Sequence, residues 1–147
     1  MPNYKEMLFE LIKFGLLFQC PRRDLPANIP NLYQEKPTIT ISYKMTVNNT
    51  HYWKGVFVVL KASSTPSKGL VFGEIDCIIC EEKTSPLIVM TLYTTVEFCN
   101  DSFCYVIERK KPSLKHCCTL ADLLDFHPLD GTLVSDNIFV RRKYFVW

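Results

Sequence analysis

The chain has few of the residues and motifs on which most enzymes and phosphate-binding proteins depend. Only five of its 147 residues are glycine, and they occur singly, so no glycine-rich loop can cradle a phosphate. The motifs G-x-x-x-x-G-K-[ST], G-x-S-x-G and H-E-x-x-H are absent, as is the dinucleotide-binding fingerprint. No acid or amide is placed by the sequence to orient His116 next to Cys117 and Cys118. We therefore predict that the protein is not an enzyme.

The sequence also lacks the features of secreted and membrane proteins. Charged residues interrupt the apolar N-terminal segment at Lys5, Glu6, Glu10 and Lys13, so we expect neither a signal peptide nor a membrane span. Seven cysteines are an odd number, which does not suit a fully paired disulfide framework. A reduced, intracellular protein is the expected class. The formal net charge is only +2, so the whole chain is not strongly attractive to polyanions.

What the chain does contain is typical of a dense β-rich core. Hydrophobic residues make up 48% of the sequence and aromatic residues 13%, and the length suits one domain. We divide the chain into an amphipathic helix over residues 1–19, a proline-rich connector over 20–37 and a β-barrel domain over 38–147. The helix is predicted from an apolar stripe that places Tyr4, Leu8, Leu11 and Phe18 on one face.

The clearest strand signal lies in residues 38–47, where apolar and polar residues alternate strictly. Further strands are expected over residues 53–61, 70–80, 87–98, 103–111 and 137–147. Asn48 and Asn49 supply turn residues after the first of these strands. Gly73 is expected to permit a tight bend or a bulge.

A short helix is predicted over residues 119–128, because Thr119 and Asp122 have the spacing of a capping box and Pro128 closes the segment. The predicted fold class is therefore mainly β with a minor α+β component. The architecture is a small antiparallel, partly closed barrel of six or seven strands, with the N-terminal helix and the short helix before the last strand.

Four cysteines have a spacing found in structural zinc sites: Cys77, Cys80, Cys99 and Cys104. The strand period argues against a shared metal, because positions i and i+3 of a strand point to opposite faces. A buried pair of ordinary thiols is the simpler interpretation, and no cofactor is predicted. A zinc-stabilised structural module is kept as a third hypothesis.

Basic clusters supply the nucleic-acid hypothesis. The residues concerned are Arg109, Lys110, Lys111, Arg141, Arg142 and Lys143. If the last strand pairs near the strand that ends at Arg109, the two groups merge into one patch. The first hypothesis is instead a non-enzymatic module that binds a protein or peptide. Its candidate surfaces are the edge beside residues 63–69 and the face with Tyr105, Tyr144 and Trp147.

From about Tyr43 to the end of the sequence, the order of six segments resembles a known family. The segments are YWKGVFVVL, VFGEIDCI, PLIVMTLYTTVEF, FCYVIER, LADLLDFHPL and IFVRRKYFV. This order resembles the C-terminal module of uncharacterised, transposon-derived animal proteins, and its cadence is similar to the bromo-adjacent homology fold. The resemblance implies a nuclear, non-catalytic and chromatin-associated module. It implies no aromatic cage at any residue of this chain.

Overall fold

The computed structural model describes residues 12–27, 29, 36–60, 70–81, 85–99, 104–110, 113–134 and 137–141. Within these ranges the protein is mainly β, and every strand pair is antiparallel. No helix of the described residues is long and apolar enough to span a membrane. The strands are β1 (Ile12–Phe14), β2 (Leu17–Pro21), β3 (Thr38–Ser42), β4 (Lys44–Val47), β5 (Thr50–Trp53), β6 (Phe57–Leu60), β7 (Val71–Ile79), β8 (Leu87–Cys99), β9 (Cys104–Arg109), β10 (Lys115–Cys118), β11 (Leu123–Leu129), β12 (Gly131–Val134) and β13 (Asn137–Arg141).

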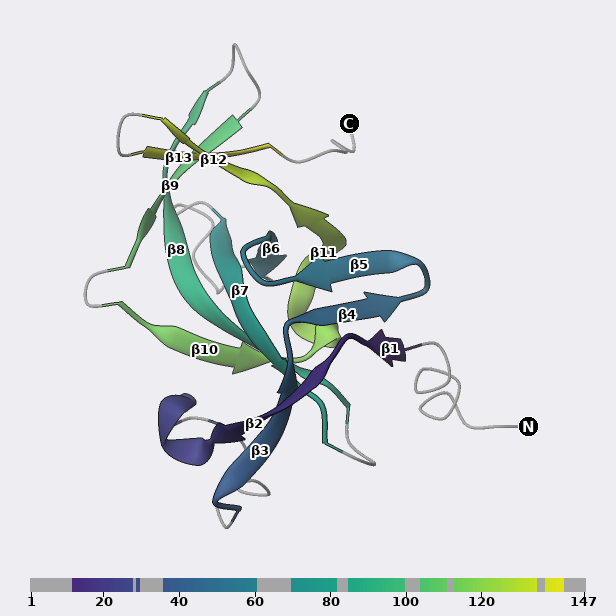
Figure 1. The fold of residues 1–147 in the computed structure, drawn as a ribbon. Coiled ribbons are helices and arrows are strands. Elements are labelled where there is room, and N and C mark those ends of the chain that lie inside the picture. The colour runs from purple at the N-terminus through teal and green to yellow at the C-terminus, as the bar shows by residue number, and fades with distance from the viewer. Residues whose placement is uncertain are drawn as a thin grey trace.

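The long central pair β7–β8 organises the larger sheet, whose main path is β11-β6-β7-β8-β9-β13-β12 (Figure 1). On its outer edge, each of these two central strands pairs with two different strands, one at each end. β6 and β3 pair with opposite ends of β7, and β9 and β10 pair with opposite ends of β8. The neighbours diverge from these long strands, so the sheet curls into an open half-barrel.

A second sheet of three strands, in the order β1-β4-β5, covers one face of the larger sheet (Figure 1). Its inward side chains Met45, Val47 and Tyr52 are buried against Ile75, Met90 and other residues of β6, β7 and β8. The hydroxyl of Tyr52 also donates a hydrogen bond to the Phe126 carbonyl of β11. Burial of these apolar side chains joins the two sheets into one core.

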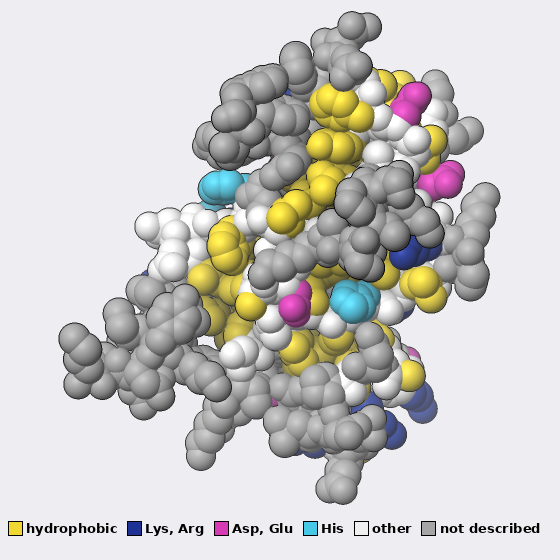
Figure 2. Space-filling model, turned by 180° about the vertical axis from the view of Figure 1, so that it is seen from behind, with side chains coloured by type: hydrophobic (Ala, Val, Ile, Leu, Met, Phe, Trp, Pro, Cys, Tyr) yellow, Lys and Arg dark blue, Asp and Glu magenta, His cyan; other side chains and the backbone are white. Residues whose placement is uncertain are grey.

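The opposite face of the larger sheet carries two more apolar clusters. One contains Ile39, Ile41, Cys77, Ile79 and Val89, and Leu25 and Ile29 pack on it. The other contains Phe57, Phe72, Tyr93, Ile107 and Val140. Seen from behind, hydrophobic side chains form a broken band across the surface (Figure 2).

A β-bulge at Asp76 changes which residues of β7 face the three-stranded sheet and which face the opposite side. The register shifts between Ile75 and Cys77, so Asp76 has no residue directly opposite on β8. Before the bulge Ile75 packs in the covered core, whereas after it Cys77 packs on the opposite face. The extra residue therefore places Asp76 and Cys77 on the same side of β7.

The predicted N-terminal helix is wrong where the structure describes it. Residues 12–14 and 17–21 are strands that pair with β4 and β3 respectively, while residues 1–11 lie outside the described ranges. Gly15 and Leu16 separate the two strands, and the Gly15 N–H donates to the Lys44 carbonyl at 3.1 Å. Strand partners 17 to 35 residues away in the sequence therefore override the local helical periodicity. The connector expected over 20–37 begins with the end of β2 and one 3-10 turn, η1 (Arg22–Asp24).

The predicted helix over residues 119–128 is also wrong beyond its first turn. Thr119 and Asp122 form the expected capping box, and η4 (Leu120–Asp122) is a single 3-10 turn. The following residues form β11, which pairs with β6 and buries Leu123 and Leu129. The apolar residues of this segment thus complete the sheet beside β6, which stabilises the strand in place of a helix.

The expected barrel is open rather than partly closed, and the described residues form thirteen short and long strands instead of six or seven. The alternating segment 38–47 is divided at Tyr43 into β3 and β4, which belong to different sheets. The expected turn at Asn48 and Asn49 is confirmed, with φ values of 50° and 65°. Such positive φ values at both turn residues match the twist of a tight hairpin.

Candidate binding groove

A groove of about 350 Å³ lies over the first of the two apolar clusters on the open face. Ile41, Cys77 and Val89 lie at its bottom, one each from β3, β7 and β8. All three side chains are buried, so the bottom is apolar and tightly packed. The volume lies at the lower end of the range for ligand pockets, which suits a short segment or a single large side chain.

One wall of the groove is the segment that follows β2, with Asp24, Leu25 and Pro26. The Leu25 N–H donates to the Arg22 carbonyl at 3.1 Å, which closes the 3-10 turn. Leu25 is partly buried against the apolar cluster below. The proline-rich sequence predicted as a surface connector therefore supplies a side of the groove.

An aromatic group stands at one end of the groove, where β3 gives way to β4. Tyr43 is 39% exposed, its ring centroid lies 5.3 Å from that of Phe18, and Lys54 Nζ lies 5.2 Å from the Tyr43 ring centroid. The backbone of Lys54 donates to the Tyr43 carbonyl at 3.0 Å, which fixes the two residues side by side. The aromatic surface thus continues the groove outward across β2.

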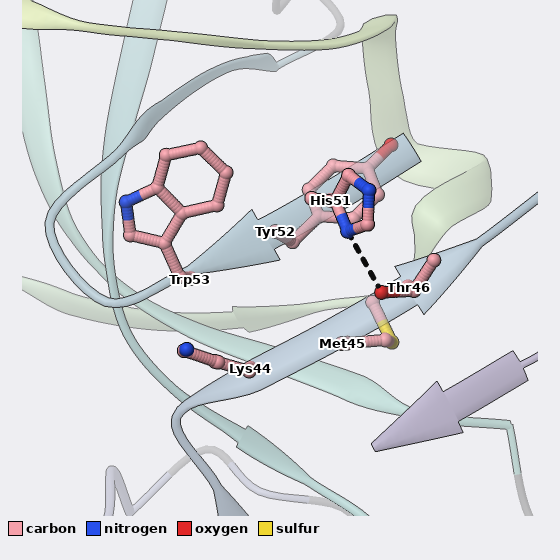
Figure 3. Close-up of a pocket in the computed structure, with 6 residues that line it drawn as sticks. All are labelled: Lys44, Met45, Thr46, His51, Tyr52 and Trp53. Carbon is pink, nitrogen blue, oxygen red and sulfur yellow. Dashed lines mark hydrogen bonds between the residues drawn. The ribbon is translucent and has the colours of Figure 1, made fainter. Parts of the chain in front are cut away.

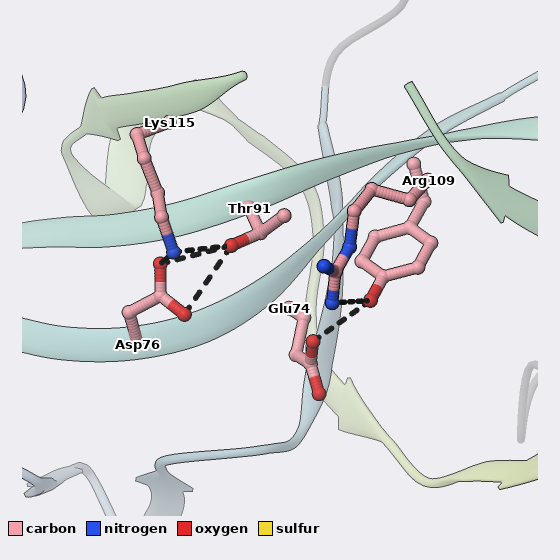
Figure 4. Close-up of polar contacts among 6 residues, drawn as sticks. Glu74, Asp76, Thr91, Arg109 and Lys115 are labelled. Carbon is pink, nitrogen blue, oxygen red and sulfur yellow. Dashed lines mark hydrogen bonds and ion pairs between the residues drawn. The ribbon is translucent and has the colours of Figure 1, made fainter. Parts of the chain in front are cut away.

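A row of charged and polar side chains, shown in Figure 4, begins with Asp76 and Lys115 at the other boundary of the groove. Lys115 Nζ lies 2.6 Å from Asp76 Oδ2 and donates to Thr91 Oγ1 at 2.7 Å. Thr91 Oγ1 in turn donates to Asp76 Oδ2 at 3.0 Å. Asp76 points toward this group from the same face of β7 as Glu74, and the buried hydroxyl of Thr91 is satisfied by both charged partners.

The same row continues along β7, β8 and β9. The buried Tyr93 hydroxyl donates to Glu74 Oε1 at 2.9 Å, and Arg109 Nη2 donates to the Tyr93 oxygen at 3.3 Å. Burial raises the pKa of Tyr93, and the neighbouring Glu74 adds to this, although the hydrogen bond from Arg109 acts in the opposite direction. Tyr93 is therefore a neutral hydrogen-bonding bridge between the two charged groups.

The thiols near the groove are held in their neutral form. Burial raises the pKa of Cys77 to about 12, with smaller contributions from Cys20 and Asp76. Burial likewise raises the pKa of Cys117 to about 11. Because the thiolate is the reactive species, these cysteines are weak nucleophiles in this environment.

The four cysteines of the zinc hypothesis do not come together. Cys77 opposes Val89 on β8, whereas Cys99 and Cys104 oppose each other at the far end of β8, roughly 30 Å along the strand. Cys80 lies beyond β7, with its Sγ 3.7 Å from the Thr40 carbonyl oxygen. Within the described ranges no group of three or more His, Cys, Asp or Glu residues is arranged to hold a metal ion.

The basic clusters of the nucleic-acid hypothesis also remain apart where they are described. β13 does pair with β9, but Arg141 opposes Cys104, so it lies roughly 16 Å along the strand from Arg109. Arg109 is also engaged by Tyr93. Lys110 follows Arg109 and is partly buried. Lys111, Arg142 and Lys143 lie outside the described residues.

The predicted partner-binding face is only partly described. Tyr105 is half-buried, and its ring lies between Phe72 and Phe98, with centroid distances of 5.4 and 4.8 Å. Tyr105 thus belongs to an aromatic row within the sheet. Tyr144, Trp147 and the edge beside residues 63–69 lie outside the described ranges.

Comparison of the chain with protein-family models, curated proteins and solved structures finds no match. The resemblance to transposon-derived animal proteins and to the bromo-adjacent homology fold therefore stays a prediction, together with the nuclear localisation that it implies. The groove itself was missed from the sequence. A strict period of two places Cys77 with Ile75 on the covered face, and only the bulge at Asp76 brings Cys77 to the groove.

Proposed function

We propose that the protein is a non-enzymatic interaction module that binds a short segment of a partner protein in the groove. The observation that carries this proposal is the combination of an apolar bottom with a boundary of mixed charge. Asp24 and Asp76 are acidic, and Lys54 and Lys115 are basic. A peptide offers apolar side chains together with polar backbone groups, which fits such a surface. The two carboxylates and two lysines balance, so the groove offers a polyanion no net attraction.

The exposed apolar residues beside the groove support a protein ligand. Phe18 of β2 is 44% exposed and its ring lies next to that of Tyr43. A contiguous apolar surface of this kind, bordered by polar residues, is typical of sites for other proteins. The raised pKa values of Cys77 and Cys117 support a binding role over thiol chemistry.

A displayed library of random peptides, selected against the full chain, tests the proposal. Peptides enriched over an unrelated β protein are expected to bind in solution and to lose at least about tenfold in affinity when Tyr43→Ala removes the aromatic wall. Trp53→Ala is the matched control, because Trp53 is 42% exposed but does not line the groove. The proposal is wrong if no peptide is enriched, or if enriched peptides bind the Tyr43→Ala variant as well as the wild type.

A further inference from the structure

A second surface, distinct from the groove, lies on the outward face of the three-stranded sheet. Thr46 of β4 opposes His51 of β5 and Lys13 of β1, so these three side chains form one row across the sheet. Lys44 opposes Trp53 and begins a second row on the same face. The alternate residues Met45 and Tyr52 face the core.

The three strands that form this face carry only basic and neutral residues, and Asp130 lines a neighbouring hollow together with His51 and Trp53. The sequence has no aspartate or glutamate from residue 36 to residue 73, a run that includes β4 and β5, and β1 contains none either. Lys13 and Lys44 are exposed, and no ion pair of either is seen among the described residues. The two lysines outweigh the single carboxylate of Asp130, so the face has a net positive charge and attracts anions, whereas the charges of the groove balance.

An exposed indole lies among these cations. Trp53 is 42% exposed and borders a shallow hollow of about 340 Å³, whose other lining residues include Lys44 and His51 (Figure 3). The His51 ring is held by a hydrogen bond of 3.0 Å between its Nδ1 and Thr46 Oγ1. A planar aromatic side chain beside exposed lysines combines the two elements that bind single-stranded nucleic acid, a stacking surface and contacts to phosphates.

We propose that this outward face binds single-stranded nucleic acid. A base stacks on Trp53, and Lys13 and Lys44 contact the neighbouring phosphates. The face is a sheet surface, and its contacts are to bases exposed in a single strand, not to the edges of paired bases in a groove. The site is formed by residues other than the basic clusters at Arg109 and Arg141, which do not merge.

Fluorescence anisotropy of a labelled 20-residue oligothymidylate, titrated with the full chain at several salt concentrations, tests this site. Two phosphate contacts predict a slope of about −1.4 for log K against log salt. The double variant Lys13→Gln/Lys44→Gln is expected to bring the slope close to zero. Trp53→Ala is expected to weaken binding by about 5- to 100-fold through loss of stacking. Thermal unfolding of each variant verifies that the sheet is intact.

The intrinsic fluorescence gives a second readout, since the chain has only two tryptophans. In a Trp147→Phe background the emission comes from Trp53 alone, and the oligonucleotide is expected to quench it. Tyr43→Ala is the matched control: it removes the groove aromatic and is expected to leave oligonucleotide binding unchanged. Failure of the groove proposal and failure of this one are thereby distinguished.

Three outcomes would overturn the site. The first is the absence of binding at low salt. The second is equal loss of binding with Arg141→Gln, which would place the contact at the other end of the molecule. The third is equally effective competition by polyglutamate of matched charge, which would assign the face to acidic proteins instead of nucleic acid.

Discussion

Gly73 of β7 lies directly against Met90 of β8, with no space for a side chain between them. A Cβ atom at position 73 would be 2.9 Å from Met90 Cγ, 3.2 Å from its Cβ and closer still to its sulfur. Gly73 was expected to allow a bend or a bulge, but the bulge falls at Asp76. The glycine is required by the close approach of a side chain from the next strand.

Gly73→Ala is expected to lower the free energy of unfolding by about 1–3 kcal/mol, because the added methyl group overfills the core. In a Met90→Ala background the space is open, so the same change should cost much less, with a coupling energy of about 0.5–3 kcal/mol. Urea unfolding of the four proteins in this double-mutant cycle measures the coupling. Strict additivity would contradict the close approach of the two residues.

Thr91→Val tests the polar row. Valine keeps the shape of the side chain but removes the hydroxyl that donates to Asp76 and accepts from Lys115. We expect a loss of about 1–2 kcal/mol in the free energy of unfolding, because Thr91 is buried and its charged partners each lose a hydrogen bond. The control is Thr132→Val on the exposed strand β12, for which a change below about 0.5 kcal/mol is expected. Equal changes in the free energy of unfolding for both variants would show that the hydroxyl of Thr91 does not stabilise the fold.

Tyr93→Phe tests the bridge between Glu74 and Arg109. The hydroxyl joins both side chains, so its removal should lower the free energy of unfolding by about 1–2 kcal/mol. Tyr105→Phe is the matched control, because no hydrogen bond of its hydroxyl is seen among the described residues. Thermal or urea unfolding of the two variants, compared with the wild type, distinguishes the cases. A larger effect for Tyr105→Phe would contradict the bridge.

The buried thiols predict a loss of stability in alkali. Burial raises the pKa of Cys77 and Cys118 to about 12, whereas both ionise near 9 when unfolded. Between these values the folded state binds more protons than the unfolded state, so stability falls as the pH rises from about 9 toward 12. The slope is about 1.4 kcal/mol per pH unit for each thiol.

Urea unfolding of the reduced protein at several pH values measures this slope. The stability contributed by the neutral thiols is fully present below pH 9. Cys77→Val removes one ionising group and keeps an apolar side chain, so the alkaline slope should become shallower by about one proton. An unchanged slope in this variant would show that Cys77 is not held neutral by the fold.

Much of the β architecture is predictable because its signals are local. The alternation over residues 38–47 correctly identifies the buried side chains of Ile39, Ile41, Met45 and Val47. It is wrong at its centre, where Tyr43 is 39% exposed and Ser42 is buried. The asparagine pair predicts its own turn, since asparagine tolerates positive φ. The thiol of Cys77 was expected to be buried, as cysteine often is, and it is.

The two wrong helices had local patterns that fitted a helix equally well. In residues 12–14 the pattern is apolar–Lys–apolar, which suits a strand, but the same residues also continue the helical apolar stripe that begins at Tyr4. Only the presence of β4 beside it makes the strand the more stable state. Residues 123–129 depend in the same way on β6, because a strand leaves its backbone groups unsatisfied until a partner arrives.

The groove and the basic face illustrate the same limit for function. The acid-free run from residue 36 to 73 was present in the sequence and could have indicated an anion-binding surface. The geometry of that surface could not be predicted from the sequence. Lys13, Lys44 and Trp53 share one face only because of how β1, β4 and β5 pair. The groove requires residues from β3, β7, β8 and the segment after β2, which no local pattern connects.

The sequence by itself determined that this protein is mainly β, where its strands alternate and where its tight turns and capping box lie. These features depend on side-chain period and on backbone preferences within a few residues. Only the tertiary structure decided that residues 12–14 and 17–21 are strands and that the bulge falls at Asp76. It also decided that position 73 has no room for a side chain. Each of these depends on pairing or packing between residues that are distant in sequence, for which the chain carries no local signal.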